Sequence, residues 1–80
     1  MLDKILEWFD EEELLIANGF DEAIIGIDEH SFRLIYSCKI CIDILLEEGM
    51  NYEDAIEHFE YNVRGSYVGT KTPIWCVDHL

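Results

Sequence analysis

The sequence predicts one small α+β domain in the order α-β-β-α-α-β, with a three-stranded, mainly antiparallel sheet and the helices on one face. Three observations predict this fold. The chain has 80 residues, enough for one core, and no Ser/Gly/Pro-rich linker divides residues 1–80 into parts. Two long segments have helical periodicity. Three short β-branched or apolar runs lie between polar or proline boundaries, and three strands are more stable than two.

Residues 1–18 are expected to form an N-terminal helical segment. The apolar residues with helical spacing are Leu2, Ile5, Leu6 and Phe9. Asp10–Glu13 has the pattern of an N-cap followed by an acidic first turn, so we expect two short helices with a break near Asp10. Asn18 and Gly19 both tolerate positive φ and should end the segment.

A β-hairpin is expected next. Residues 23–27 are short and β-branched, which favours a strand, and residues 28–31 have turn composition. Phe32–Tyr36 is open to two interpretations, a second strand or the first turns of a helix that continues to Glu48. We favour the strand, because Ser37 is a good N-cap and a four-residue turn closes a hairpin.

Two helices should follow the hairpin. Residues 38–48 are apolar around most of the helix circumference, which predicts a central helix that Gly49 ends. Asn51 should cap the next helix, which is amphipathic and should end near Gly65. Residues 73–77 open with proline and are apolar, as in a last strand.

The charge is strongly acidic. Eighteen Asp and Glu against five Lys and Arg give a net charge of −13. Seventeen of the acids lie in residues 1–60, where the balance is −14, and residues 61–80 carry +1. This balance argues against direct binding of nucleic acid and against an anchor on anionic lipid, because both need a basic surface.

The compartment can also be argued from the sequence. No apolar run reaches the roughly 18 residues of a membrane span, and acids interrupt the N-terminus where a signal peptide would be apolar. Three cysteines would leave one unpaired in any disulfide scheme, which favours reduced thiols. We therefore expect a cytoplasmic protein.

Two motifs lie close together within residues 49–74. Gly49–Ala55 has the pattern G-M-x-x-E-[DE]-A, and Glu60–Ile74 has the pattern E-[FY]-N-V-x-G-x-[YW]-x-G-x-x-T-P-[IV]. Together they resemble a family of small proteins from tailed bacteriophages and prophages. The resemblance implies an α+β domain and a phage source, and it transfers no activity, substrate or catalytic residue.

The resemblance extends upstream through residues 19–27 and 35–45, so residues 19–77 are the family-like core. Ser37 stands where the family often has aspartate, and Cys38 stands where the family is expected to have an aromatic residue. The departure at Cys38 argues against a metal site common to the family.

A zinc site is the sharpest chemical hypothesis. Cys38-x-x-Cys41 and Cys76-x-x-His79 supply four ligands in two pairs, which could make a tetrahedral Cys₃His site. The competing interpretation is that the thiols are small buried hydrophobes, and it is the one we favour, with no cofactor. A third interpretation makes Cys38 and Cys41 a redox pair at a helix start, where a thiol pKa is often lowered.

The loop between the last helix and the last strand is the best candidate for a binding surface, because loops on rigid scaffolds often carry binding. Its candidate residues are Asn62, Arg64, Tyr67, Lys71 and Thr72. The alternative is that these residues only stabilise the loop.

These observations favour a small acidic phage protein that binds a host or phage protein without catalysis, as an inhibitor or modulator. The acidic body is either a solvated surface or a mimic of the DNA phosphate backbone that attracts a basic partner. The alternative is a small zinc- or ligand-binding domain. An enzyme comes third, because no catalytic motif is present. Trp8 and Phe9 form an apolar pair that could join subunits in a homo-oligomer.

Overall fold

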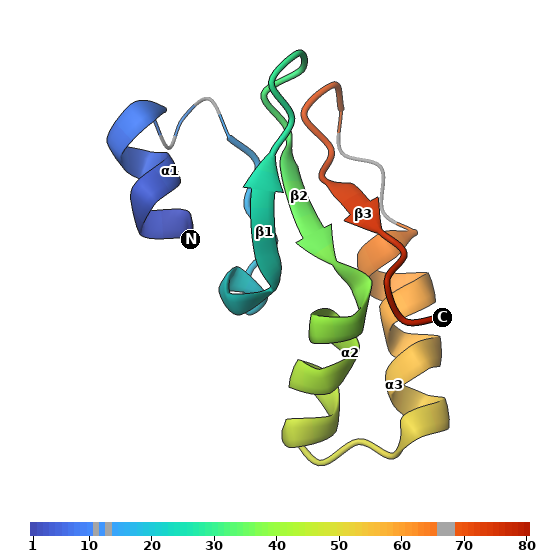
Figure 1. Ribbon diagram of the computed structural model, residues 1–80. Coiled ribbons are helices and arrows are strands. Elements are labelled where there is room, and N and C mark those ends of the chain that lie inside the picture. The colour runs from blue at the N-terminus through green and yellow to red at the C-terminus, as the bar shows by residue number, and fades with distance from the viewer. Residues whose placement is uncertain (11, 13, 66–68) are drawn as a thin grey trace.

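The computed structural model describes residues 1–10, 12, 14–65 and 69–80 (Figure 1). Its elements are helix α1 (Leu2–Trp8), the 3₁₀ helix η2 (Asp21–Ala23), strands β1 (Ile24–Ile27) and β2 (Leu34–Ser37), helices α2 (Cys38–Glu47) and α3 (Tyr52–His58), the π-helical segment η3 (Phe59–Arg64) and strand β3 (Ile74–Cys76). The predicted α+β class and the order helix, two strands, two helices, strand are confirmed.

The sheet is mixed. Its strand order is β1-β2-β3, with β1 antiparallel to β2 and β2 parallel to β3. One of the two pairs is therefore parallel, where the sequence led us to expect mainly antiparallel pairing. Parallel neighbours need a long crossover, and α2 and α3 lie in the connection from β2 to β3, as Figure 1 shows.

The hairpin confirms that Phe32–Tyr36 contributes a strand rather than a helix, since β2 contains Leu34–Ser37. The turn is closed by the Asp28 carboxylate, which accepts hydrogen bonds of 2.7 Å from both the backbone N–H and the hydroxyl of Ser31. Phe32 has a φ of 55°, which is strained for a bulky side chain. Its ring packs against that of Phe9, with centroids 5.3 Å apart, and so ties the end of α1 to the turn.

The core lies on one face of the sheet, under the helices. Its buried members are Ile5, Leu14, Phe20, Ala23, Ile24, Leu34, Tyr36, Cys38, Cys41, Ile42, Leu45, Ala55 and Phe59. They come from every helix and from both strands of the hairpin. Trp75 of β3 joins them by packing its ring 5.1 Å from Tyr36 and edge-on, at 5.5 Å, to Phe59.

The N-terminal segment has the predicted break near Asp10, but it has no second helix over residues 14–18. Helix α1 ends at Trp8, because Phe9 is extended (φ −132°, ψ 141°), and residues 14–18 are not helical. The backbone N–H of Ala17 donates 2.8 Å to the hydroxyl of Tyr36, a tertiary contact instead of a helical one. Residues 11 and 13, inside the predicted capping pattern, lie outside the described residues.

The caps of the two central helices are as predicted. The Ser37 hydroxyl accepts from the N–H of Ile40 at 3.1 Å, and the Asn51 side chain accepts from the N–H of Asp54 at 2.9 Å. The helical segment ends at Gly65, as expected. A Cβ at Gly65 would lie 2.8 Å from the carbonyl oxygen of Glu60, so the π-helical end needs glycine there. Within the described residues, no helix has the length and apolar character needed to cross a membrane.

Candidate functional site

The structure divides the predicted binding residues between two places. Asn62 and Arg64 belong to η3, where Arg64 pairs with Glu60 at 3.0 Å. Lys71 and Thr72 belong to the segment before β3, which lies against the hairpin turn. Tyr67 lies outside the described residues.

The basic side chains next to the hairpin turn already make structural contacts. Lys71 donates 2.9 Å to the carbonyl oxygen of Ser31, and its ammonium lies 5.7 Å from the centroid of the Phe32 ring. Arg33 donates 2.6 Å to the carbonyl oxygen of Thr72. These bonds tie the segment before β3 to the hairpin, which fits the structural interpretation of Lys71 and Thr72.

The thiols of α2 lie in the core. Cys38 and Cys41 have no exposed surface. Burial raises the pKa of the Cys41 thiol to about 12, and burial also raises the pKa of Cys38. The redox interpretation needs a lowered pKa at Cys38, and the direction found is the opposite.

The proposed zinc ligands do not come together as a site. Cys76 is half-buried on β3, and the Nδ1 atom of His79 is buried without a hydrogen-bond partner. Within residues 1–10, 12, 14–65 and 69–80, no three His, Cys, Asp or Glu side chains form a group that could hold a metal ion. The zinc hypothesis therefore has no support from the arrangement of these side chains in the described residues.

Asp78 is a residue that the sequence analysis missed. Its carboxylate accepts a 2.5 Å hydrogen bond from the hydroxyl of Ser37 and a 2.8 Å bond from the backbone N–H of Lys39. These two bonds hold the pKa of Asp78 below its usual value. They satisfy a free N–H of the first turn of α2 and place a negative charge at the positive end of that helix. Ser37 and Asp78 are 41 residues apart, so no local pattern could have shown the pairing.

Asp78→Ala is expected to lower the free energy of unfolding by about 1–2 kcal/mol at neutral pH, because the buried Ser37 hydroxyl loses its acceptor. The folded-state pKa of Asp78 is lowered, so its contribution is present above its ordinary pKa and is lost as the pH falls through the folded-state pKa. Urea denaturation should therefore show a gap between wild type and variant that closes below about pH 4. Asp43→Ala, which removes only a surface pair with Lys39, is the control and should cost less than about 0.5 kcal/mol. An equal loss in both variants would contradict the assignment.

A cavity of about 350 Å³ lies among the N-terminal segment, η3 and β3. It is lined by Leu15, Ile16, Ala17, Asn18, Phe20, Asn62, Val63, Pro73 and Trp75. The lining is mostly apolar and contains no carboxylate, which is notable in so acidic a chain. Trp75 contributes to the wall of the cavity. Its indole N–H has no hydrogen-bond acceptor, but it is buried, so an occupant of the cavity would not reach it.

A second concave surface lies on the outer side of α3 and η3. Its lining is Tyr52, Glu53, Ile56, Glu57, Glu60 and Tyr61, around a volume of about 630 Å³, and we call it the α3–η3 groove. Tyr52 is 58% exposed and Tyr61 is 77% exposed, whereas Ile56 between them is half-buried.

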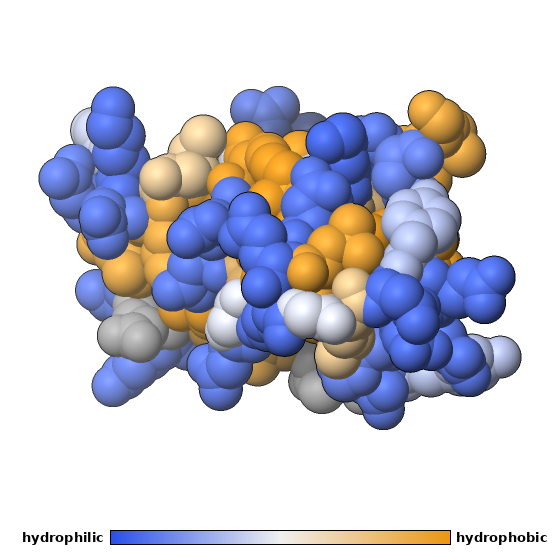
Figure 2. Space-filling model, turned by 90° about the horizontal axis from the view of Figure 1, so that it is seen from below, coloured by the Kyte–Doolittle hydropathy of each residue, from blue (hydrophilic) through white to orange (hydrophobic). Residues whose placement is uncertain are grey.

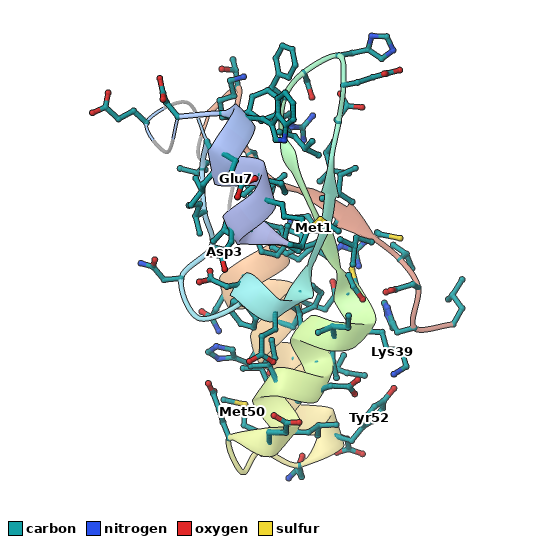
Figure 3. All side chains as sticks on the ribbon, turned by 60° about the vertical axis from the view of Figure 1, so that its left-hand side comes forward. Met1, Asp3, Glu7, Lys39, Met50 and Tyr52 are labelled. Carbon is teal, nitrogen blue, oxygen red and sulfur yellow. The ribbon has the colours of Figure 1, made fainter. Side chains whose placement is uncertain are left out.

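In Figure 3 the side chain of Tyr52 lies on the outside of the α2–α3 hairpin, on the same side as Lys39. Seen from the tip of this hairpin, hydrophobic side chains reach the surface between hydrophilic ones (Figure 2).

Most carboxylates of the described residues have no basic partner. The ion pairs of Lys and Arg with acids there are Lys39–Asp43 and Arg64–Glu60, both between neighbouring turns of a helix. The excess negative charge therefore faces solvent. Comparison of the chain with models of protein families, with curated proteins and with solved structures finds no match.

Proposed function

We propose that this protein acts by binding another protein, without catalysis, and that the partner presents a basic surface. The resemblance to phage and prophage proteins supports a host or phage protein in the bacterial cytoplasm as that partner, which the binding inhibits or modulates. The negative charge would also allow the protein to mimic a DNA phosphate backbone and so occupy the DNA-binding surface of its partner.

The unneutralised charge carries this proposal. The net charge is −13 on 80 residues, and two ion pairs of Lys or Arg are found in the described part of the chain. A charge of this size speeds encounter with a basic partner and discourages acidic ones. No feature of equal strength supports chemistry, because the thiols of α2 are buried and their pKa values are raised.

Immobilised protein should capture a specific basic partner from bacterial lysate at low salt and release it at high salt. The physical reason is screening, since the Debye length falls from about 30 Å at 0.01 M to about 3 Å at 1 M ionic strength. A variant with Asp3, Glu7 and Glu22 changed to the corresponding amides removes three negative charges at exposed positions outside the core. If the charge attracts the partner, this variant should capture less of it at low salt. Capture that does not depend on salt, or the absence of any basic partner at low salt, would refute the proposal.

A further inference from the structure

We infer that the α3–η3 groove is where the partner docks, and that the groove receives a segment of the partner with two arginine side chains about 13 Å apart. This inference rests on the proposed function, and it adds the surface and the chemistry of the segment.

Exposed aromatic area is the first reason. Tyr52 and Tyr61 are each more than half exposed, although Phe59 in the same helical segment has no exposed surface. Phe59, on the inner side of the segment, thus supplies the contact with the core. The two exposed tyrosines contribute little to the stability of the fold. Tyrosine offers a large, rigid contact area with few rotamers to fix, and it is enriched at protein interfaces for this reason.

The π-helical segment brings the two tyrosines to one groove. Residues nine positions apart lie about 180° apart on a regular α-helix. The chain turns less per residue in η3, so Tyr61 lies closer to the side of Ile56, and both tyrosines line the same groove. Tyr52 and Tyr61 are about 13 Å apart along the axis, from a rise of about 1.5 Å per residue. An extended segment covers this length in about four residues.

The negative charge of the groove favours arginine as the residue that the partner's segment inserts. Glu60 is paired with Arg64, but Glu53 and Glu57 are exposed and make no ion pair within the described residues. A guanidinium can bond a carboxylate through two N–H groups and stack on a tyrosine ring at the same time, which an ammonium cannot do. Ile56 on the floor offers apolar contact to the aliphatic part of an arginine side chain. An acidic segment would be repelled by Glu53 and Glu57, and a neutral one would leave these two carboxylates without a partner.

The test uses a synthetic peptide with two arginines separated by three neutral residues. Titrated into ¹⁵N-labelled protein, it should shift the amide signals of residues 52–61 and leave those of α1 unchanged. The same peptide with citrulline in place of arginine has the same shape without the charge, and it should bind at least about tenfold more weakly. A lysine version should fall between the two.

Two variants locate the binding. Tyr52→Ala and Tyr61→Ala should each weaken the arginine peptide about fivefold, and both should keep the circular dichroism of the wild type because both rings are exposed. Trp8→Ala is the matched control, an exposed aromatic residue on α1 that is 82% exposed, and it should leave binding unchanged. Equal binding of the citrulline peptide, shifts spread over all acidic segments, or an equal effect of Trp8→Ala would each overturn the inference.

The lysate experiment separates this inference from the proposed function. If the wild type captures a basic partner and a variant with both Tyr52→Ala and Tyr61→Ala captures it equally, the docking surface is elsewhere and only this inference fails. If the wild type captures no basic partner, the proposed function fails as well. Loss of capture in the tyrosine variant, with capture retained in Trp8→Ala, supports both.

Discussion

Replacing Phe59 by alanine should leave the domain only marginally stable at room temperature, with a free energy of unfolding of about 0–2 kcal/mol. Phe59 has no exposed surface, and its ring packs edge-on against Trp75 with centroids 5.5 Å apart. It therefore joins η3 to β3 through the core. Removal of a buried phenylalanine side chain costs about 3–5 kcal/mol, and a chain of this size has a total stability near the lower end of about 5–15 kcal/mol. Urea denaturation followed by circular dichroism would measure the loss.

Tyr61→Ala is the matched control for Phe59→Ala. Tyr61 is two residues away in the same π-helical segment, and it is 77% exposed. Its replacement should change the free energy of unfolding by no more than about 0.5 kcal/mol. Similar losses in the two variants would mean that η3 does not pack on the sheet through Phe59.

Local signals were sufficient for the hairpin and the two central helices. The β-branched run of β1, the polar turn after it and the N-caps Ser37 and Asn51 each act within a few residues, and the structure has each of them where the sequence predicted. Gly65 ended the last helical segment for a reason that is also local, since a Cβ there would collide with the carbonyl of Glu60.

Long-range contacts explain what the sequence could not show. Residues 14–18 have the apolar composition of a helix, but the N–H of Ala17 is taken by the hydroxyl of Tyr36, 19 residues away. The parallel pairing of β2 with β3 depends on where the chain re-enters the sheet after two helices. The bond between Ser37 and Asp78 likewise depends on the complete fold. None of these contacts leaves a periodic pattern in the sequence.

The candidate site, too, was predictable only where local signals determine it. The sequence placed Arg64 and Lys71 in the last loop as candidate binding residues, whereas the structure puts Arg64 in η3 and gives each of the two a structural partner. The α3–η3 groove was missed because a regular helical projection puts Tyr52 on the apolar side and Tyr61 on the opposite side. Only a π-helical turn places them along one groove, and no simple sequence rule marks such a turn.

The thiol of Cys41 should resist alkylation in the folded protein. Its pKa is raised from 9.0 to about 12 by burial, which lowers the thiolate fraction about a thousandfold at pH 8. Cys41 also has no exposed surface for a reagent to reach, whereas Cys76 is only partly buried. Mass spectrometry after treatment with iodoacetamide should therefore find label on Cys76 well before Cys41. In urea all three cysteines should react at comparable rates.

A chelator distinguishes burial from metal protection. If Cys41 is protected by the core, EDTA leaves its alkylation rate in the folded protein unchanged, because nothing but unfolding exposes the sulfur. If a metal ion held Cys38, Cys41, Cys76 and His79, the chelator would raise the rates of all three thiols together and lower the stability of the fold. Burial instead predicts that the rate of Cys41 follows the free energy of unfolding, so that Phe59→Ala accelerates it and Tyr61→Ala does not. Rapid labelling of Cys41 in the stable wild type would contradict the packed interior of α2 and restore the chemical interpretations of its cysteines.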